Sequence, residues 1–75
     1  MTARQIKELL DATPFVPFKV HVAAEQQAYD IPHPDFALLT HKGGVLAVAL
    51  ADADAVHLIS VPLITRIETT EAKPA

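Results

Sequence analysis

Cysteine is absent from this sequence of 75 residues. No disulfide can staple the fold, and no thiol can act as nucleophile, redox centre or zinc ligand. Basic residues are few, since six Lys and Arg stand against nine Asp and Glu and give a formal net charge of −3. Such a charge provides no overall attraction to nucleic acid or to an anionic membrane.

The first residues lack the long apolar stretch of a signal peptide or a membrane span, and run directly into an amphipathic pattern. We therefore expect a soluble, uncleaved chain with no membrane partner. The absence of cysteine agrees with a cytoplasmic location.

What the chain does have is apolar residues, at 51% of the total, which predicts a folded domain. The length allows one hydrophobic core. We expect a single domain over residues 1–70 and a flexible tail over residues 71–75. Part of the apolar surface is expected to meet a partner.

A short helix is predicted over about residues 3–12. Thr2 and Gln5 have capping-box spacing, and apolar residues then recur at helical intervals from Ile6. Pro14 ends the pattern, because proline restricts the residue before it and donates no helical hydrogen bond.

About five strands are predicted after the helix. Phe18, Val20 and Val22 alternate with more polar residues, which is typical of a half-buried strand. After a turn at residues 25–27, Tyr29 and Ile31 belong to the core side of a second strand. Residues 32–34 (Pro-His-Pro) then form a rigid corner, and extended structure resumes over residues 36–39.

A turn at residues 41–44 precedes Val45–Leu50, an apolar run that we expect to be covered on both faces. The last two strands are predicted over residues 56–61 and 63–69, with Pro62 between them. This order predicts an α+β fold in which the antiparallel strands form a small bent sheet or open barrel and the helix covers one end. The sheet has edge strands with unpaired backbone groups, and its third and fourth strands are apolar on both faces. Both features predict self-association.

Three segments, Thr13–His21, Ile31–Phe36 and Val61–Glu68, resemble a family of short uncharacterised bacterial proteins. The resemblance covers most of the chain and lies in a T-P-F-x-P-F block and a P-H-P-[DE] block. It implies no particular activity. The order of helix and strands, with the break at Val61–Leu63, also resembles the Sm-like fold, whose members build rings. The Asp-x-x-Asn and Arg-Gly elements of Sm-like RNA binders are not present.

The four histidines show no spacing that places two imidazoles together. His21 and His57 are expected on the solvent side of their strands. His33 differs, because prolines flank it and Asp30 and Asp35 are close enough in sequence to orient its ring. A histidine-dependent metal or ligand site at His33 and Asp35 is one hypothesis; a stiff corner in which Asp35 caps the next turn is the structural alternative.

The remaining candidate motifs are better explained as structural features than as functional sites. Asp52 and Asp54 lack the further acids of a calcium loop, and Gly43–Gly44 lacks the context of a phosphate loop. Ser60 is the only serine, and it should point to the opposite face from His57. We therefore predict no enzyme, no metal site and no cofactor.

Two functions remain as hypotheses. The first is a small non-enzymatic module, for binding or scaffolding, that forms homo-oligomers and meets a protein partner. The alternative is an Sm-like ring that binds RNA. In that case four residues would gather as the electrostatic contacts, with His33 near the nucleotide; they are Lys19, His21, Lys42 and Arg66.

Overall fold

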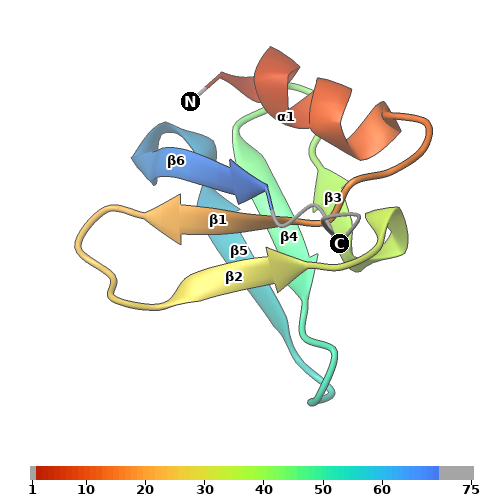
Figure 1. Cartoon of the computed structure of the whole chain (residues 1–75). Helices are drawn as coiled ribbons and strands as arrows, with labels where there is room; N and C mark the ends of the chain where they lie inside the picture. Colours follow the sequence, from red (N-terminus) through yellow and green to blue (C-terminus); the bar gives the residue numbers. More distant parts are fainter. Residues whose placement is uncertain (1, 70–75) are drawn as a thin grey trace.

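The computed structural model describes residues 2–69, which form one helix and six antiparallel strands (Figure 1). The order is α1 (Ala3–Asp11), β1 (Phe18–Val22), β2 (Ala28–Ile31), β3 (Ala37–Leu39), β4 (Val45–Ala49), β5 (Val56–Ser60) and β6 (Ile64–Thr69), with short 3-10 helices η1 (Pro34–Phe36) and η2 (Val61–Leu63). The α+β class is confirmed. The predicted tail over residues 71–75 lies outside the described residues.

The helix begins at the predicted cap. The Thr2 hydroxyl accepts a hydrogen bond from the backbone N–H of Gln5, and the Gln5 side chain accepts one from the N–H of Thr2. These two bonds satisfy N–H groups that a helix leaves free at its first turn. Ile6 is fully buried and anchors α1 to the core.

The strands form two three-stranded sheets, in the orders β2-β1-β6 and β3-β4-β5. Two corners connect them. The predicted Pro-His-Pro corner divides one expected strand into β2 and β3, and η2 separates β5 from β6 at Pro62. Figure 1 shows the two sheets crossing, with α1 lying across one end. The strands form two sheets and not one closed barrel.

Each sheet turns one face to a common core. The buried residues come from α1, both sheets and η2, and they are Ile6, Phe18, Val20, Val22, Ile31, Leu46, Val48, Ile59, Val61 and Ile64. Among residues 2–69, no buried residue is polar or charged. The alternation of Phe18, Val20 and Val22 is confirmed, since all three are buried while Lys19 and His21 are half-buried.

The expectation that Val45–Leu50 is covered on both faces is wrong. Burial in β4 alternates, so that Leu46 and Val48 face the core while Val45, Ala47 and Ala49 are half-buried on the other side. One sheet packs against only one face of β4, and nothing in residues 2–69 covers the second face completely. Self-association therefore loses its original basis, and any argument for it has to rest on exposed side chains.

The connection between β1 and β2 begins earlier than predicted. Glu25 N–H donates to the Val22 carbonyl at 3.2 Å, which closes a turn at Ala23 and Ala24. Ala24 adopts a positive φ of 65°. The predicted turn at residues 25–27 is therefore only the second half of the connection.

Candidate functional site

His33 and Asp35 lie at the corner between β2 and β3, exposed to solvent. The Nδ1 atom of His33 accepts a long hydrogen bond of 3.4 Å from the backbone N–H of Asp35, and lies 3.6 Å from its carboxylate. The expected cap is therefore reversed: His33 caps η1, and Asp35 donates. No third ligand lies nearby, because residues 2–69 hold no group of three His, Cys, Asp or Glu residues suited to a metal.

Three of the four proposed RNA contacts do come together. Lys19, His21 and Arg66 lie on the outward face of the β2-β1-β6 sheet, because β1 pairs with β6 in a register that places His21 opposite Arg66 and Lys19 opposite Glu68. Acids accompany them. Lys19 Nζ lies 3.8 Å from Asp30, and Arg66 Nη2 lies 3.8 Å from Glu68. The face is therefore a mixed-charge surface.

His21 lies at the centre of this cluster. Its Nε2 atom is 3.0 Å from Glu68 Oε1 and 3.3 Å from Arg66 Nη2. One ring nitrogen cannot donate and accept at once, so Nε2 donates to Glu68 or accepts from Arg66. The hydrogen bond from His21, with the nearby positive charges, holds the pKa of Glu68 below its usual range.

Lys42, the fourth proposed RNA contact, lies elsewhere. It belongs to the turn between β3 and β4, which Gly43 N–H closes by donating to the Thr40 carbonyl at 2.8 Å. There it lines a hollow beside α1 together with Arg4 and Lys7. Those two cations are paired along the helix with Glu8 and Asp11, respectively.

An exposed apolar surface covers the outward face of the β3-β4-β5 sheet. Leu38 and Leu58 lie on either side of Ala47 in one cross-strand row, and their exposed fractions are 67% and 74%. Val56 adds a third large exposed side chain. We call this surface the outer face and define it by Leu38, Val45, Ala47, Ala49, Val56 and Leu58. It carries no charged side chain.

Within residues 2–69, one backbone edge of strand β5 pairs with no other strand. Val61 N–H donates to the Gly44 carbonyl and Leu50 N–H donates to the Ala55 carbonyl, so residues 55, 57, 59 and 61 turn their backbone groups towards β4. Because backbone direction alternates along a strand, Val56, Leu58 and Ser60 turn theirs away from the sheet. The backbone N–H and C=O groups of these three residues therefore form the outer edge of β5, beside the outer face.

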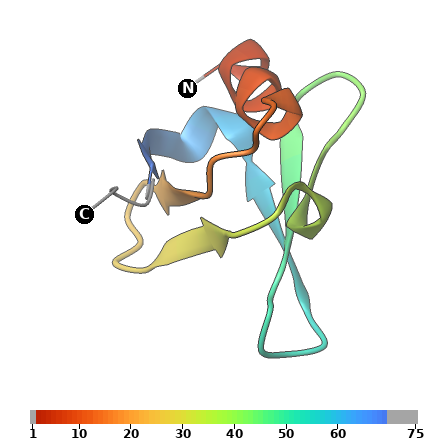
Figure 2. The same ribbon diagram turned by 45° about the vertical axis from the view of Figure 1, so that its right-hand side comes forward.

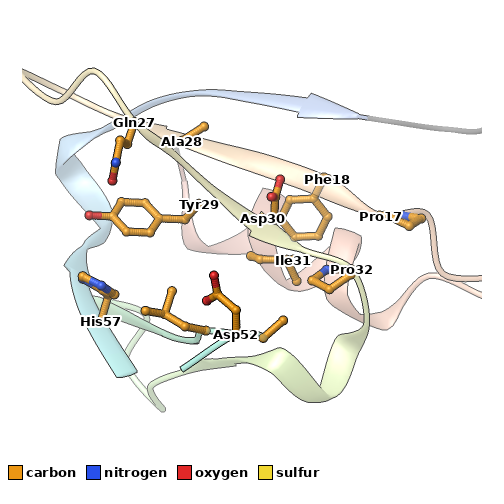
Figure 3. A pocket seen from close by; sticks show the side chains of 12 residues that line it. Pro17, Phe18, Gln27, Ala28, Tyr29, Asp30, Ile31, Pro32, Asp52 and His57 are labelled. Atoms are coloured by element: carbon orange, nitrogen blue, oxygen red, sulfur yellow. The ribbon is translucent and has the colours of Figure 1, made fainter. Parts of the chain in front are cut away.

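A groove of about 800 Å³ opens between β2 and the β4–β5 hairpin (Figure 3). Figure 2 shows this hairpin projecting away from the other sheet. Tyr29 and His57 form one end of the groove, with ring centroids 5.0 Å apart and planes at 51°. Asp52 points into the space beside them, while Pro17 and Pro32 lie at the other end (Figure 3).

His57 is exposed, as expected, but it lies on the other face of its strand from the one predicted. It lies opposite Val48 and on the same face as buried Ile59, so it faces inward where the two sheets diverge. Ser60 lies on the other face, as predicted. The sequence could not reveal the side of His57, because both faces of β5 carry apolar residues.

Tyr29 lies on the core side of its strand, as expected, and is half-buried against the core at the wall of the groove. Its hydroxyl donates a 2.7 Å hydrogen bond to Glu25 Oε1. That bond raises the pKa of Tyr29, and burial and the negative charge of Glu25 act in the same direction. The ring is therefore held in place from both ends, by its strand and by Glu25.

Residues 2–69 contain no helix that is long and apolar enough to cross a membrane. A comparison with known protein families, curated proteins and solved structures found no match to this chain.

Proposed function

We propose that this chain is a small non-enzymatic binding or scaffold module that associates with copies of itself through the outer face and the edge of β5. The observation that carries the proposal is the pair of exposed leucines, Leu38 and Leu58, on either side of Ala47, beside an edge of β5 that pairs with no strand of residues 2–69. Contiguous exposed apolar surface is typical of an interaction site, and an open strand edge is a template for another strand. The cysteine-free composition fits a cytoplasmic module.

A second copy of the chain suits this surface for two reasons. The outer face has no charge, so two copies meet without repulsion or buried unpaired ions. Antiparallel pairing is also self-complementary, since a twofold axis beside Leu58 places one β5 next to another and each edge supplies the donors that the other lacks. The two sheets would then form one continuous sheet of six strands.

The experiment separates the face from the edge. Leu58→Lys places a charge on the outer face, and its monomer should fold because Leu58 is exposed. Burying one leucine contributes roughly 1.5–3 kcal/mol, and about 1.4 kcal/mol corresponds to tenfold in affinity. We therefore expect association at least about tenfold weaker by sedimentation velocity. Leu63→Lys is the control, since Leu63 is also exposed but lies in η2.

Ser60→Pro tests the edge. Ser60 already has a φ of −70°, which proline requires, and its N–H points away from β4. The variant should fold normally and lose edge pairing, whereas Ser60→Ala should retain it. A wild-type chain that sediments as a monomer at every concentration would overturn the proposal, as would variants that associate as tightly as the wild type.

The alternative is an Sm-like ring that binds RNA. In support, η2 separates the last two strands, and β5 and β6 each pair with only one neighbour in residues 2–69, so β5 of one copy can meet β6 of the next. The electrostatic part has less support, because Lys19, His21 and Arg66 lie beside carboxylates. Native mass spectrometry separates a dimer from a larger ring. Absence of binding to a short oligoribonucleotide at low salt would eliminate RNA.

A further inference from the structure

We propose that the groove between β2 and the β4–β5 hairpin binds an extended basic peptide, with an arginine side chain seated between Tyr29 and Asp52. The groove is separate from the outer face, so this inference does not depend on self-association. It follows from the charge of the groove, the arrangement of its aromatic rings and the edge of β2, which pairs with no strand of residues 2–69.

The acidic residues that line the groove favour a positively charged ligand. Among residues 2–69, two acidic residues, Asp30 and Asp52, line the groove, and no Lys or Arg does. Lys19 approaches Asp30 at 3.8 Å, but in residues 2–69 no cation lies within ion-pair distance of Asp52. Glu25 adds negative charge at the Tyr29 hydroxyl. A positively charged ligand would therefore meet attraction at Asp52, where no lysine or arginine competes for the carboxylate.

The rings favour arginine among cations. A guanidinium group stacks on aromatic faces and forms two parallel hydrogen bonds with a carboxylate. Tyr29 offers a ring fixed through its hydroxyl by Glu25, with His57 packed against it. Asp52 points into the space beside these rings (Figure 3). One planar cation could contact Tyr29 with its face and Asp52 with its N–H groups.

The edge of β2 accounts for an extended peptide. Ala23 N–H donates to the Leu63 carbonyl, so the backbone groups of Ala23 point to β6. Because this direction alternates along β1, the backbone groups of Lys19 and His21 also point to β6, and those of Val20 point to Tyr29 in β2. By alternation, Ala28 and Asp30 turn their N–H and C=O groups away from β1. Both residues line the groove, so a peptide strand can pair there with main-chain hydrogen bonds.

The far end of the groove is apolar. Pro17 and Pro32 lie there near the ring of buried Phe18 (Figure 3). In an extended peptide, side chains on one face recur every second residue. The peptide that fits therefore carries an arginine and, two residues away, an aliphatic residue.

The test is an NMR titration at low ionic strength with the peptide Ac-Ala-Arg-Ala-Val-Ala-NH2. Its matched control replaces arginine with citrulline, which keeps the shape and removes the charge. We expect saturable shifts at the amides of Ala28, Asp30, Asp52 and His57, and at least tenfold weaker binding of the citrulline peptide.

Variants identify the contacts. Asp52→Asn should reduce binding of the arginine peptide to the citrulline level, whereas Asp54→Asn, the same change two residues away and outside the groove, should not. Tyr29→Phe keeps the ring and should keep most of the affinity, and Tyr29→Leu should lose it. Leu58→Lys should bind as the wild type does, which separates this inference from the proposed self-association.

Two results would overturn the inference. Equal binding of the citrulline and arginine peptides would show that the guanidinium is not recognised. Equal losses of affinity for the arginine peptide in Asp52→Asn and Asp54→Asn would show only a general effect of net charge.

Discussion

The backbone of Gly43 lies so close to the methyl group of Ala3 that a Cβ atom on Gly43 would overlap it. This contact joins the start of α1 to the turn between β3 and β4. Gly43 also has a φ of +76°, a conformation that residues with a side chain rarely adopt. Two independent constraints therefore require glycine at this position.

Gly43→Ala is expected to lower the free energy of unfolding by about 1–3 kcal/mol, because strain at the left-handed backbone adds to the overlap with Ala3. Gly44→Ala is the control: nothing lies within 4 Å of a Cβ atom there, so its effect should be small. The double variant Ala3→Gly, Gly43→Ala removes the overlap but keeps the left-handed backbone, so it should recover only the part of the stability that the overlap costs. Urea denaturation measures all of these, and equal stability of Gly43→Ala and Gly44→Ala would contradict the prediction.

Ala24 presents the opposite case, an alanine where glycine fits better. Its φ of 65° lies in the left-handed region, in the turn closed by Glu25 and Val22. Ala24→Gly should raise the free energy of unfolding by about 1 kcal/mol, because relief of strain exceeds the entropy cost of glycine. Ala23→Gly, at a neighbour without positive φ, should lower it. Thermal unfolding that ranks the two variants the other way would refute this account.

Tyr29 is the only tyrosine and the sequence has no tryptophan, so ultraviolet absorbance reports its titration alone. The hydrogen bond to Glu25 raises the pKa of Tyr29 above its ordinary value. Glu25→Gln removes the negative charge and weakens the acceptor, so the measured pKa of Tyr29 should fall. Glu8→Gln, on α1, should leave it unchanged, and an unchanged pKa in Glu25→Gln would contradict the assignment.

The same shift predicts a pH dependence of stability. The folded chain holds the Tyr29 proton more tightly than the unfolded chain does, because the pKa is raised on folding. This contribution is complete below the unfolded pKa and is lost as pH rises through the folded pKa. Stability in Glu25→Gln should therefore depend less on pH in the alkaline range than stability in the wild type does.

Several features of the fold could be predicted from the sequence because they depend on neighbours along the chain. The capping box of Thr2 and Gln5 formed, α1 ended before Pro14, and β1 alternated as expected. Prolines at 32, 34 and 62 fixed the corners by removing backbone donors. The single discrepancy in α1 is its last residue, Asp11, one position before the predicted end.

The candidate sites depended on contacts that the sequence does not encode locally. Glu68 neutralises the proposed basic patch only because β1 and β6 pair in a register that sets it opposite Lys19. A sequence shows that both residues belong to strands, but not which pairs with which. The prediction that Lys42 gathers with Lys19, His21 and Arg66 was wrong for a similar reason, because the turn that carries Lys42 lies beside α1.

The sequence by itself determined the α+β class, the helix and the corners, because caps, prolines and alternation act over a few residues. Tertiary structure alone decided which side of β5 faces the core. Both sides carry apolar residues, so burial followed from packing against the second sheet, which covers Ile59 and leaves Leu58 exposed. The same packing brought His57 to Tyr29 and opened the groove between the sheets.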